Sequence, residues 1–198
     1  MRTLEEAALD ASTCTRCRLS QGRTQVVYGV GDPNADLMFI GEAPGFHEDK
    51  QGEPFVGAAG QLLNQLLAEI GIARQDVYIN NTVNCRPPGN RDPLPDELEA
   101  CKPWLDERVA LIDPAVVVTL GNWATRYILG KQVSISRVRG QRFPWSGRTV
   151  IPTFHPAAVL HGGGQASNQM TALRADFQEI RRALAERPQP AEEQLGLF

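Results

Sequence analysis

The sequence predicts an α/β domain in which helices cover both faces of a central parallel sheet, giving three α/β/α layers. Short apolar segments suited to buried strands alternate along the chain with longer segments of helical spacing. Parallel neighbouring strands need a crossover, usually a helix, so the alternation favours a central sheet of four parallel strands. A chain of 198 residues with 42% hydrophobic residues can bury one such core.

The first half of the chain supplies two strands and one crossover helix. Residues 36–40 form an apolar run that ends in a loop rich in Gly and Pro, as a buried strand before a tight turn does. Residues 57–70 carry leucines at helical spacing, and Gly71 ends that helix. A second strand is expected at 77–80, followed by a loop over 81–95 that its prolines keep irregular.

The second half continues the alternation. We expect helices at 96–112, 122–129 and 169–186, and strands at 115–120 and 149–154. A small hairpin is predicted before the last strand, from turn residues and an alternating apolar pattern. These residues are Val133, Ile135, Val138, Gly140 and Gly147.

We expect residues 1–186 to form one domain and residues 187–198 to be a tail rich in Pro, Glu and Gln that cannot bury a core. No run of eighteen apolar residues occurs, and the first ten residues lack the basic start and apolar stretch of a secretory signal. We therefore expect a cytoplasmic protein, outside the membrane and acting as a monomer.

Charge is unevenly distributed along the chain. The net charge is −3, yet residues 114–175 contain no Asp or Glu. Such a stretch can form a positive face that neutralises DNA phosphates, or it can be an ordinary solvated surface. Its basic residues are Arg126, Lys131, Arg137, Arg139, Arg142, Arg148 and Arg174.

Four cysteines suggest a metal site. Cys14 and Cys17 form a Cys-x2-Cys pair, which can present two thiolates to one metal, and Cys85 and Cys101 can complete a tetrahedral set. Disulfides are disfavoured in a reducing compartment. Spacing alone does not separate zinc from an iron-sulfur cluster, and unliganded core cysteines remain an alternative.

Three segments occur in order along the chain: GEAPGFHEDKQGEPFVGAAGQLL, NNTVNCRPPGNR and FHPAAVL. Together with the cysteines they resemble family four uracil-DNA glycosylases over residues 10 to about 185. The resemblance implies an enzyme that flips uracil out of single- or double-stranded DNA and hydrolyses its N-glycosidic bond, which starts base excision repair. It also implies that the four cysteines hold a four-iron four-sulfur cluster near the N-terminus, with a structural role.

The family's first motif matches Gly41, Glu42, Ala43 and Pro44, so this loop is implied to lie close to the flipped base and its sugar. Glycine permits close approach, and the backbone N–H groups of Glu42 and Ala43 can donate to a uracil carbonyl. The sequence departs from better-known uracil-DNA glycosylases here, because Ala43 stands where those enzymes have a water-activating Asp. Glu42 is the nearest carboxylate, able either to orient water or to stabilise the sugar cation.

Asn81 is implied to select the base. Its amide can accept from uracil N3–H and donate to O4, whereas cytosine presents the reverse pattern and would leave buried polar groups unpaired. Asn80 is the adjacent competitor, and Asn84 and Asn90 are weaker candidates.

Three further positions are implied to shape the site. Phe55 would stack on the uracil ring, and Glu48 would help to exclude the methyl group of thymine. His155 is placed beside uracil O2, where its N–H can stabilise the departing anion. Val159 and Leu160 can be the apolar wedge that fills the hole left by the base, or they can begin a core turn.

Three other functions compete with this interpretation. A protein that captures uracil-DNA covalently would carry a basic insertion in the loop after the second strand, and that insertion is absent. A noncatalytic metal-stabilised DNA-binding module would explain the cysteines and arginines but not Asn81 together with His155. A glycosylase acting on a broader range of deaminated bases remains open.

The final residues resemble the pentapeptide by which bacterial repair enzymes dock on the replication sliding clamp. Leu and Phe side chains on a flexible tether can enter an apolar cleft. The matching residues are Gln194, Leu195, Leu197 and Phe198.

Deleting residues 194–198 is therefore expected to abolish pull-down by the sliding clamp, because the apolar anchors are lost. The same truncation should leave uracil release from naked DNA unchanged. Clamp capture by the truncated chain would contradict a docking role for this segment.

Overall fold

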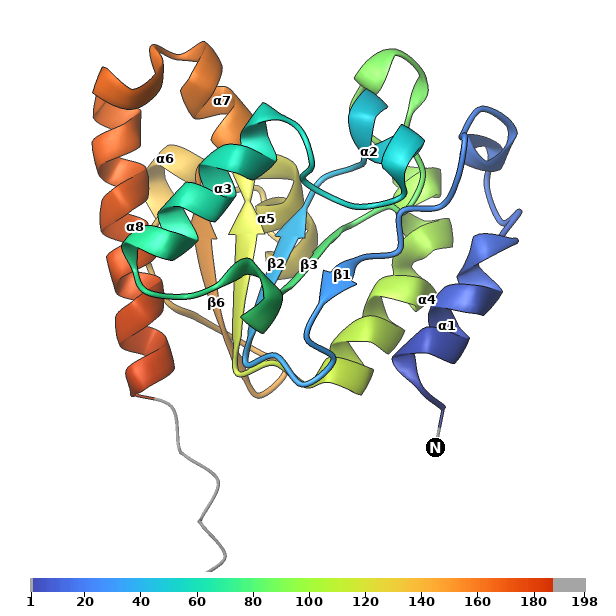
Figure 1. The fold of residues 1–198 in the computed structure, drawn as a ribbon, viewed down its shortest axis with the longest axis horizontal. Coiled ribbons are helices and arrows are strands. Elements are labelled where there is room, and N and C mark those ends of the chain that lie inside the picture. Colours follow the sequence, from blue (N-terminus) through green and yellow to red (C-terminus); the bar gives the residue numbers. More distant parts are fainter. Residues whose placement is uncertain (1, 187–198) are drawn as a thin grey trace, which may run out of the picture.

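A six-stranded sheet forms the centre of the molecule (Figure 1), seen in a computed structural model that describes residues 2–186. Its strand order is β1-β3-β2-β4-β6-β5. The strands are β1 (Val30–Gly31), β2 (Leu37–Gly41), β3 (Tyr78–Asn81), β4 (Val116–Leu120), β5 (Phe143–Trp145) and β6 (Arg148–Thr153).

Helices precede, connect and follow these strands. The α-helices are α1 (Leu4–Ser12), α2 (Phe46–Gln51), α3 (Ala58–Glu69), α4 (Pro95–Ile112), α5 (Gly121–Leu129), α6 (Ile135–Val138), α7 (Pro156–His161) and α8 (Asn168–Ala185). Short 3-10 turns occur at Arg18–Gln21, Arg74–Asp76, Pro88–Asn90 and Gly164–Ala166.

The four predicted strands are present as β2, β3, β4 and β6, and they pair parallel to one another. The prediction of a sheet with only four parallel strands is wrong at both edges, because β1 and β5 add antiparallel strands. The two-residue β1 is too short to give an apolar pattern, and β5 contains Pro144, which is tolerated only at an edge. The sheet is therefore mixed, with a parallel centre.

The predicted hairpin lies further along the chain than the sequence suggested. Residues 135–138 form the short helix α6, and the hairpin joins β5 to β6. Its two turn residues, Ser146 and Gly147, have φ values of 47° and 79°. Positive φ at both positions is the geometry of the tight turns that match strand twist, so Gly147 was the informative signal.

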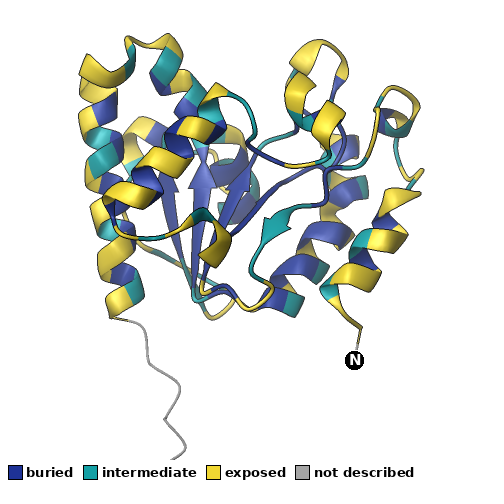
Figure 2. Ribbon diagram, in the orientation of Figure 1, coloured by how far each residue is buried: buried dark blue, intermediate teal, exposed yellow. Residues whose placement is uncertain are grey.

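Helices cover both faces of the sheet, and the central strands β2, β3 and β4 between them are buried (Figure 2). One core joins α3, α7 and α8 to one face, through residues such as Phe39 and Phe177. The other joins α4 and α5 to the opposite face, through residues such as Met38 and Val117. No helix in the described part of the chain is both long and apolar enough to cross a membrane.

The parallel pairing gathers loops at one edge of the sheet. Gly41 and Asn81 are register partners at the ends of β2 and β3, and His155 follows the end of β6 by two residues. The carboxyl ends of parallel strands are where α/β proteins bind ligands, because loops from separate segments meet there. The fold thus brings the three sequence motifs to one edge.

Candidate active site

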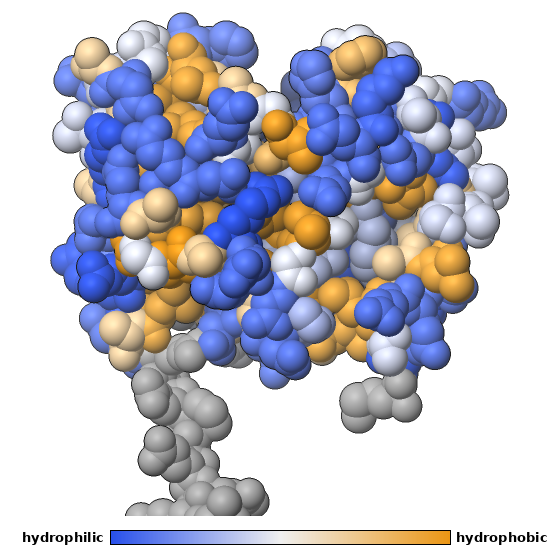
Figure 3. Space-filling view, in the orientation of Figure 1, coloured by the Kyte–Doolittle hydropathy of each residue, from blue (hydrophilic) through white to orange (hydrophobic). Residues whose placement is uncertain are grey.

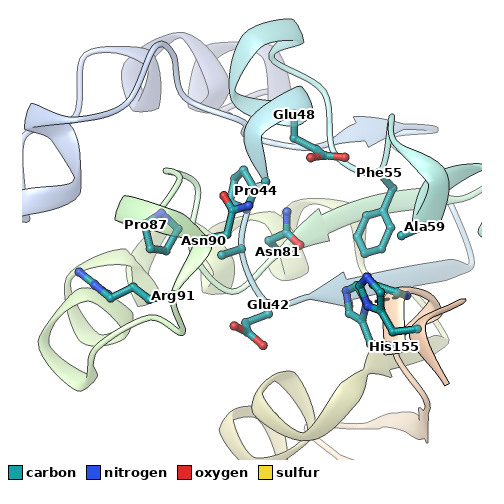
Figure 4. A pocket seen from close by; sticks show the side chains of 14 residues that line it. Glu42, Pro44, Glu48, Phe55, Ala59, Asn81, Pro87, Asn90, Arg91 and His155 are labelled. Atoms are coloured by element: carbon teal, nitrogen blue, oxygen red, sulfur yellow. Dashed lines mark hydrogen bonds between the residues drawn. The ribbon is translucent and has the colours of Figure 1, made fainter. Parts of the chain in front are cut away.

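A cavity of about 410 Å³ opens at this carboxyl edge of the sheet. It lies between α2 and the loop after β3 on one side and α3 and α7 on the other, where the space-filling view shows a notch in the molecular outline (Figure 3). The predicted site residues that line it are Glu42, Ala43, Pro44, Glu48, Phe55, Asn81 and His155. Figure 4 shows the polar side chains of Glu42, Asn81 and His155 around this one space.

Gly41 leaves room for two of these side chains. A Cβ atom at this position would lie 2.4 Å from Oδ1 of Asn81 and 2.8 Å from the ring of Phe55. Any side chain here would displace the amide or the ring, so glycine is required by close approach. Gly41 therefore provides the space that the side chains of Asn81 and Phe55 occupy beside the cavity.

Phe55 is held in a strained conformation over the cavity. Its φ of 55° lies in the left-handed region, which a bulky residue adopts only when its surroundings enforce it. Its carbonyl occupies the space where a Cβ at Gly60 would stand, and Oε1 of Glu48 accepts hydrogen bonds from the next two backbone N–H groups at 3.0 and 3.2 Å. Glu48 and Gly60 thus fix the ring's position.

His155 is a neutral imidazole with a defined proton position. Burial lowers its pKa to about 4, against a smaller opposite effect of the Glu48 carboxylate. Its Nδ1 accepts a hydrogen bond from the backbone N–H of Ala157 at 3.2 Å, so the proton of the neutral ring is assigned to Nε2. The ring stacks on Phe55 with centroids 5.5 Å apart and an interplanar angle of 28°.

Glu42 has a carboxyl group suited to proton transfer near neutral pH. Burial raises its pKa to about 7, and the neighbouring carboxylate of Asp92 adds to the shift. Asp92 belongs to the loop after β3, so this loop sets the ionisation of a residue on the loop after β2. A carboxyl that titrates near the working pH is a candidate general base.

The loop after β3 also lines the cavity. Pro87 and Arg91 were not predicted from the sequence, and Asn90 was only a weaker candidate for selecting the base. The guanidinium of Arg91 donates to both oxygens of the fully buried Glu97, at 2.8 and 2.6 Å. Glu97 also accepts from the backbone N–H of Leu94 at 2.8 Å, at the start of α4. The position of this polar loop directly after a buried strand is the sequence signal from which these residues could have been predicted.

The four candidate asparagines have separate surroundings. Asn81 is 2% exposed and lines the cavity, whereas Asn80 is fully buried and does not. Successive strand residues point to opposite faces, so the two amides cannot both enter the site. Asn84 belongs to the cysteine region described below, and Asn90 stands at the rim.

A buried arginine fixes the backbone next to Asn81. Arg108 of α4 is 0% exposed, and its guanidinium donates to the carbonyl oxygen of Tyr28 at 2.6 Å, to Oδ1 of Asn84 at 2.7 Å and to the carbonyl oxygen of Asn81 at 3.2 Å. It also lies 4.5 Å from the centre of the Tyr28 ring. These contacts hold the end of β3 against α4.

Of the two predicted wedge residues, only Val159 is placed where it cannot act as a wedge. Val159 is 0% exposed and belongs to the core under α7, and Leu160 packs partly against the same core. A side chain that fills the core is not free to enter a DNA duplex. The alternative, that this segment begins a core turn, accounts for Val159, whereas the half-buried Leu160 remains a candidate wedge.

The basic stretch does not form an open positive face. Most of its arginines contact carboxylates from other parts of the chain: Arg139 with Asp176, Arg142 with Glu179 and Glu186, Arg148 with Asp113, and Arg174 with Glu69. Arg126 donates to the carbonyl oxygen of Val133 at 2.9 Å. Arg126, Lys131 and Arg137 form no ion pair within residues 2–186, so less than half of the predicted charge is available to phosphates.

The four cysteines line a second, much smaller cavity of about 10 Å³ between α1, the loop after β3 and α4. All four are free thiols, and three receive an N–H···S hydrogen bond. Nε1 of Trp104 donates to Cys14 at 3.3 Å, the guanidinium of Arg23 to Cys85 at 3.4 Å, and the backbone N–H of Asn84 to Cys101 at 3.3 Å. Burial raises the pKa of Cys85 to about 11 and also raises the pKa of Cys101, and the donors from Arg23 and the Asn84 backbone offset only part of these shifts.

The cysteine side chains share a cavity without being gathered around one point. Among the described residues, no three Cys, His, Asp or Glu side chains are placed so that they could hold a metal ion. The donor set, four thiols with N–H groups directed at three of the sulfur atoms, nevertheless suits the chemistry of an iron-sulfur cluster.

Comparison with known proteins assigns the family. A model of the uracil DNA glycosylase superfamily matches residues 28–184. The chain belongs to the uracil-DNA glycosylase superfamily. A type-4 uracil-DNA glycosylase of Sulfurisphaera tokodaii is 46% identical over 190 residues, which is 91% of this chain and 84% of the relative. A type-4 enzyme of Thermotoga maritima is 51% identical over 149 residues, covering 74% and 78% of the two chains.

Type-5 uracil-DNA glycosylases are more distant relatives. That of Thermus thermophilus is 32% identical over 164 residues, covering 73% of this chain and 74% of the relative. The higher identity to type-4 enzymes over most of the chain confirms the family resemblance found in the sequence.

Proposed function

We propose that this type-4 uracil-DNA glycosylase hydrolyses the N-glycosidic bond of uracil flipped out of DNA into the 410 Å³ cavity, as the first step of base excision repair. The observation that carries the proposal is that Asn81 and His155, which come from distant segments of the chain, line the same cavity. An amide that can distinguish a keto pyrimidine thus faces the same space as an imidazole that can support the leaving base.

Asn81 selects uracil through its side-chain amide. The amide oxygen accepts from N3–H, and the amide nitrogen donates to O4. Cytosine would place an acceptor against the amide oxygen and an amino group against the amide nitrogen. Because Asn81 is 2% exposed, such a mismatch leaves buried polar groups unpaired, and the contact with Arg108 holds the backbone that carries the amide.

Phe55 and His155 act on the ring once it is inside. The face of Phe55 stacks on the uracil, and Glu48 keeps Phe55 in place through the backbone that follows it. Nε2–H of His155 donates to uracil O2, where negative charge accumulates as the glycosidic bond breaks. A neutral N–H donor is suited to this role because it can stabilise the developing negative charge without first losing a proton or bound water.

Glu42 in its ionised form orients the attacking water and stabilises the positive charge on the sugar. Its carboxyl lines the cavity together with Asn81 and His155, and no carboxylate is available at Ala43. With a pKa near 7, Glu42 is increasingly ionised as the pH rises through neutrality.

Cys14, Cys17, Cys85 and Cys101 would hold the four-iron four-sulfur cluster. Bound there, the cluster supplies a cross-link between the segment after α1, the loop after β3 and α4. Trp104, Arg23 and the Asn84 backbone donate to its thiolates. Since Arg108 joins the same loop to Asn81, the cross-link also supports the base-reading end of β3.

Among the rival functions, covalent capture is disfavoured by the loop after β3, which carries Pro87 and Asn90 at the cavity and no added histidine. A noncatalytic binding module gives no reason for Glu42 and His155 to share a base-sized cavity. Action on other deaminated bases is decided by the same assay that tests the main proposal.

That assay measures release of free base from single-stranded DNA and from duplexes with U:G, U:A, T:G or hypoxanthine pairs, with abasic sites revealed by alkaline cleavage. We expect release of uracil only. Asn81→Ala should lower kcat/KM about tenfold to hundredfold, because a hydrogen-bonded selection is lost. Asn34→Ala, in an exposed loop before β2, is the control. Absence of uracil release by the wild-type chain would refute the proposal.

Glu42→Gln is expected to slow single-turnover cleavage about tenfold or more at pH 8 with an unchanged thermal unfolding profile. The wild-type rate should rise with pH around a midpoint near 7, since the raised pKa leaves Glu42 protonated and inactive below it. Asp92→Asn should move this midpoint to lower pH by removing the neighbouring negative charge. Wild-type rates in Glu42→Gln would remove Glu42 from the mechanism.

Purified protein is expected to be brown, to absorb near ~400 nm and to contain about four iron atoms per chain. Cys17→Ala should lose the absorption and much of the iron, whereas Ser20→Ala, which changes another wall residue of the same cavity, should retain both. Stoichiometric zinc without iron would contradict the cluster.

A further inference from the structure

Phe46 stands out as an exposed aromatic residue at the rim of the cavity. Its side chain is 47% exposed, and it follows Gly45, which lines the cavity. Two cations stand over its ring, with Nζ of Lys50 5.6 Å and the guanidinium carbon of Arg86 5.1 Å from the ring centre. Neither cation forms an ion pair within residues 2–186, so both charges remain available to a ligand.

The charges of α2 are divided between its two sides. Glu48 turns inward and accepts from the backbone after Phe55, and the buried Asp49 accepts from the backbone N–H of Thr24 at 2.8 Å. Phe46 and Lys50 are exposed. The outer side of this short helix is thus apolar and positive although the helix as a whole carries two carboxylates.

Arg86 connects this outer side to the uracil cavity. Its Nε donates to Oδ1 of Asn90 at 2.7 Å, and Asn90 lines the cavity. Figure 1 shows α2 beside the loop after β3 at the open edge of the sheet, and the contact of Arg86 with Phe46 joins the two. The exposed ring therefore belongs to the same rim that a flipped nucleotide must pass.

A second hollow of about 390 Å³ continues from this rim and shares Pro87 and Arg91 with the uracil cavity. It is lined by Arg18, Arg86 and Arg91 among others. Arg18 and Arg91 are paired with carboxylates at the start of α4, whereas Arg86 is not. Arg86, which also contacts the ring of Phe46, thus carries the positive charge of this hollow that no carboxylate within residues 2–186 balances.

We propose that Phe46, Lys50 and Arg86 form a binding site for the nucleotide next to the flipped uridine on the same DNA strand. The base of that nucleotide stacks on Phe46, and its phosphate lies between the two cations. This inference rests on the proposed function, because the uracil cavity fixes where the neighbouring nucleotide must be.

The chemistry of the site matches a nucleic acid strand. A strand offers a flat ring and an anion within one repeating unit, and proteins that bind single strands combine aromatic stacking with basic side chains. The arginines of the basic stretch are largely paired, so this rim is where unpaired positive charge meets an exposed ring beside the cavity. Stacking also tolerates any base, which suits an enzyme that must act wherever uracil occurs.

The test measures binding of a fluorescein-labelled single strand carrying a tetrahydrofuran abasic analogue, which cannot be cleaved. Phe46→Ala should raise Kd about tenfold, and Phe46→Trp should restore binding, because stacking is regained. Lys50→Gln and Arg86→Gln should each reduce the salt dependence of log Kd by about 0.7, the value for one phosphate contact on a single strand. Arg181→Gln is the matched control and should change neither quantity, because this exposed arginine near the end of α8 has no ion pair within residues 2–186.

Shortened substrates separate contact from a structural role. With nucleotides removed from one side of the uridine, the kcat/KM of Phe46→Ala should equal that of wild type, whereas removal from the other side should leave the defect in place. An unchanged Kd in Phe46→Ala, or a defect independent of both truncations, would overturn this site. A wild-type chain that binds DNA through Phe46 but releases no uracil would instead refute the proposed function alone.

Discussion

The guanidinium of Arg108 is the contact on which the rest of the site depends. A fully buried cation is costly unless its donors are satisfied, and the two Nη groups of Arg108 donate to oxygens of Tyr28, Asn84 and Asn81, while its Nε has no partner within residues 2–186. Moving the end of β3 would remove two of the three oxygens that this charge contacts. The same loop backbone donates to Cys101, so the base-reading residue and the cysteine cavity are held by one hydrogen-bonded unit. Two contacts therefore hold the chain at Asn81 in place, one with Arg108 of α4 and one between the loop after β3 and the Cys101 thiol.

The cavity favours the neutral forms of its two central ionisable groups, His155 and Glu42. Burial lowers the pKa of His155 and raises that of Glu42, and both shifts favour the neutral forms. The result differs for the two residues. His155 stays a neutral donor throughout the physiological range, whereas Glu42 titrates within it. One environment therefore produces a fixed hydrogen-bond donor and a carboxyl of adjustable charge, as is common in active sites.

Local patterns in the sequence predicted most of the fold and the location of the site. The buried strands that end at Gly41 and Asn81 are continuous apolar runs, and a parallel arrangement brings their ends together. The edge strands escaped prediction because a two-residue strand and one containing Pro144 leave no periodic signal. The partners of Arg139 and Arg174 lie on other segments, so charge counted along the chain overstated the positive surface. Likewise, the burial of Val159 depends on the packing of α7, which its own neighbourhood in the sequence does not specify.

The ion pairs of these arginines affect how strongly this molecule attracts DNA over a distance. With a net charge of −3 and most cations of the basic stretch already neutralised, it has little long-range attraction for a polyanion. Electrostatic steering speeds association and supports sliding along a duplex, and both are weak for a protein with this charge distribution. Short-range contacts made at the cavity rim after collision therefore contribute more to its attraction for a strand than the long-range field does.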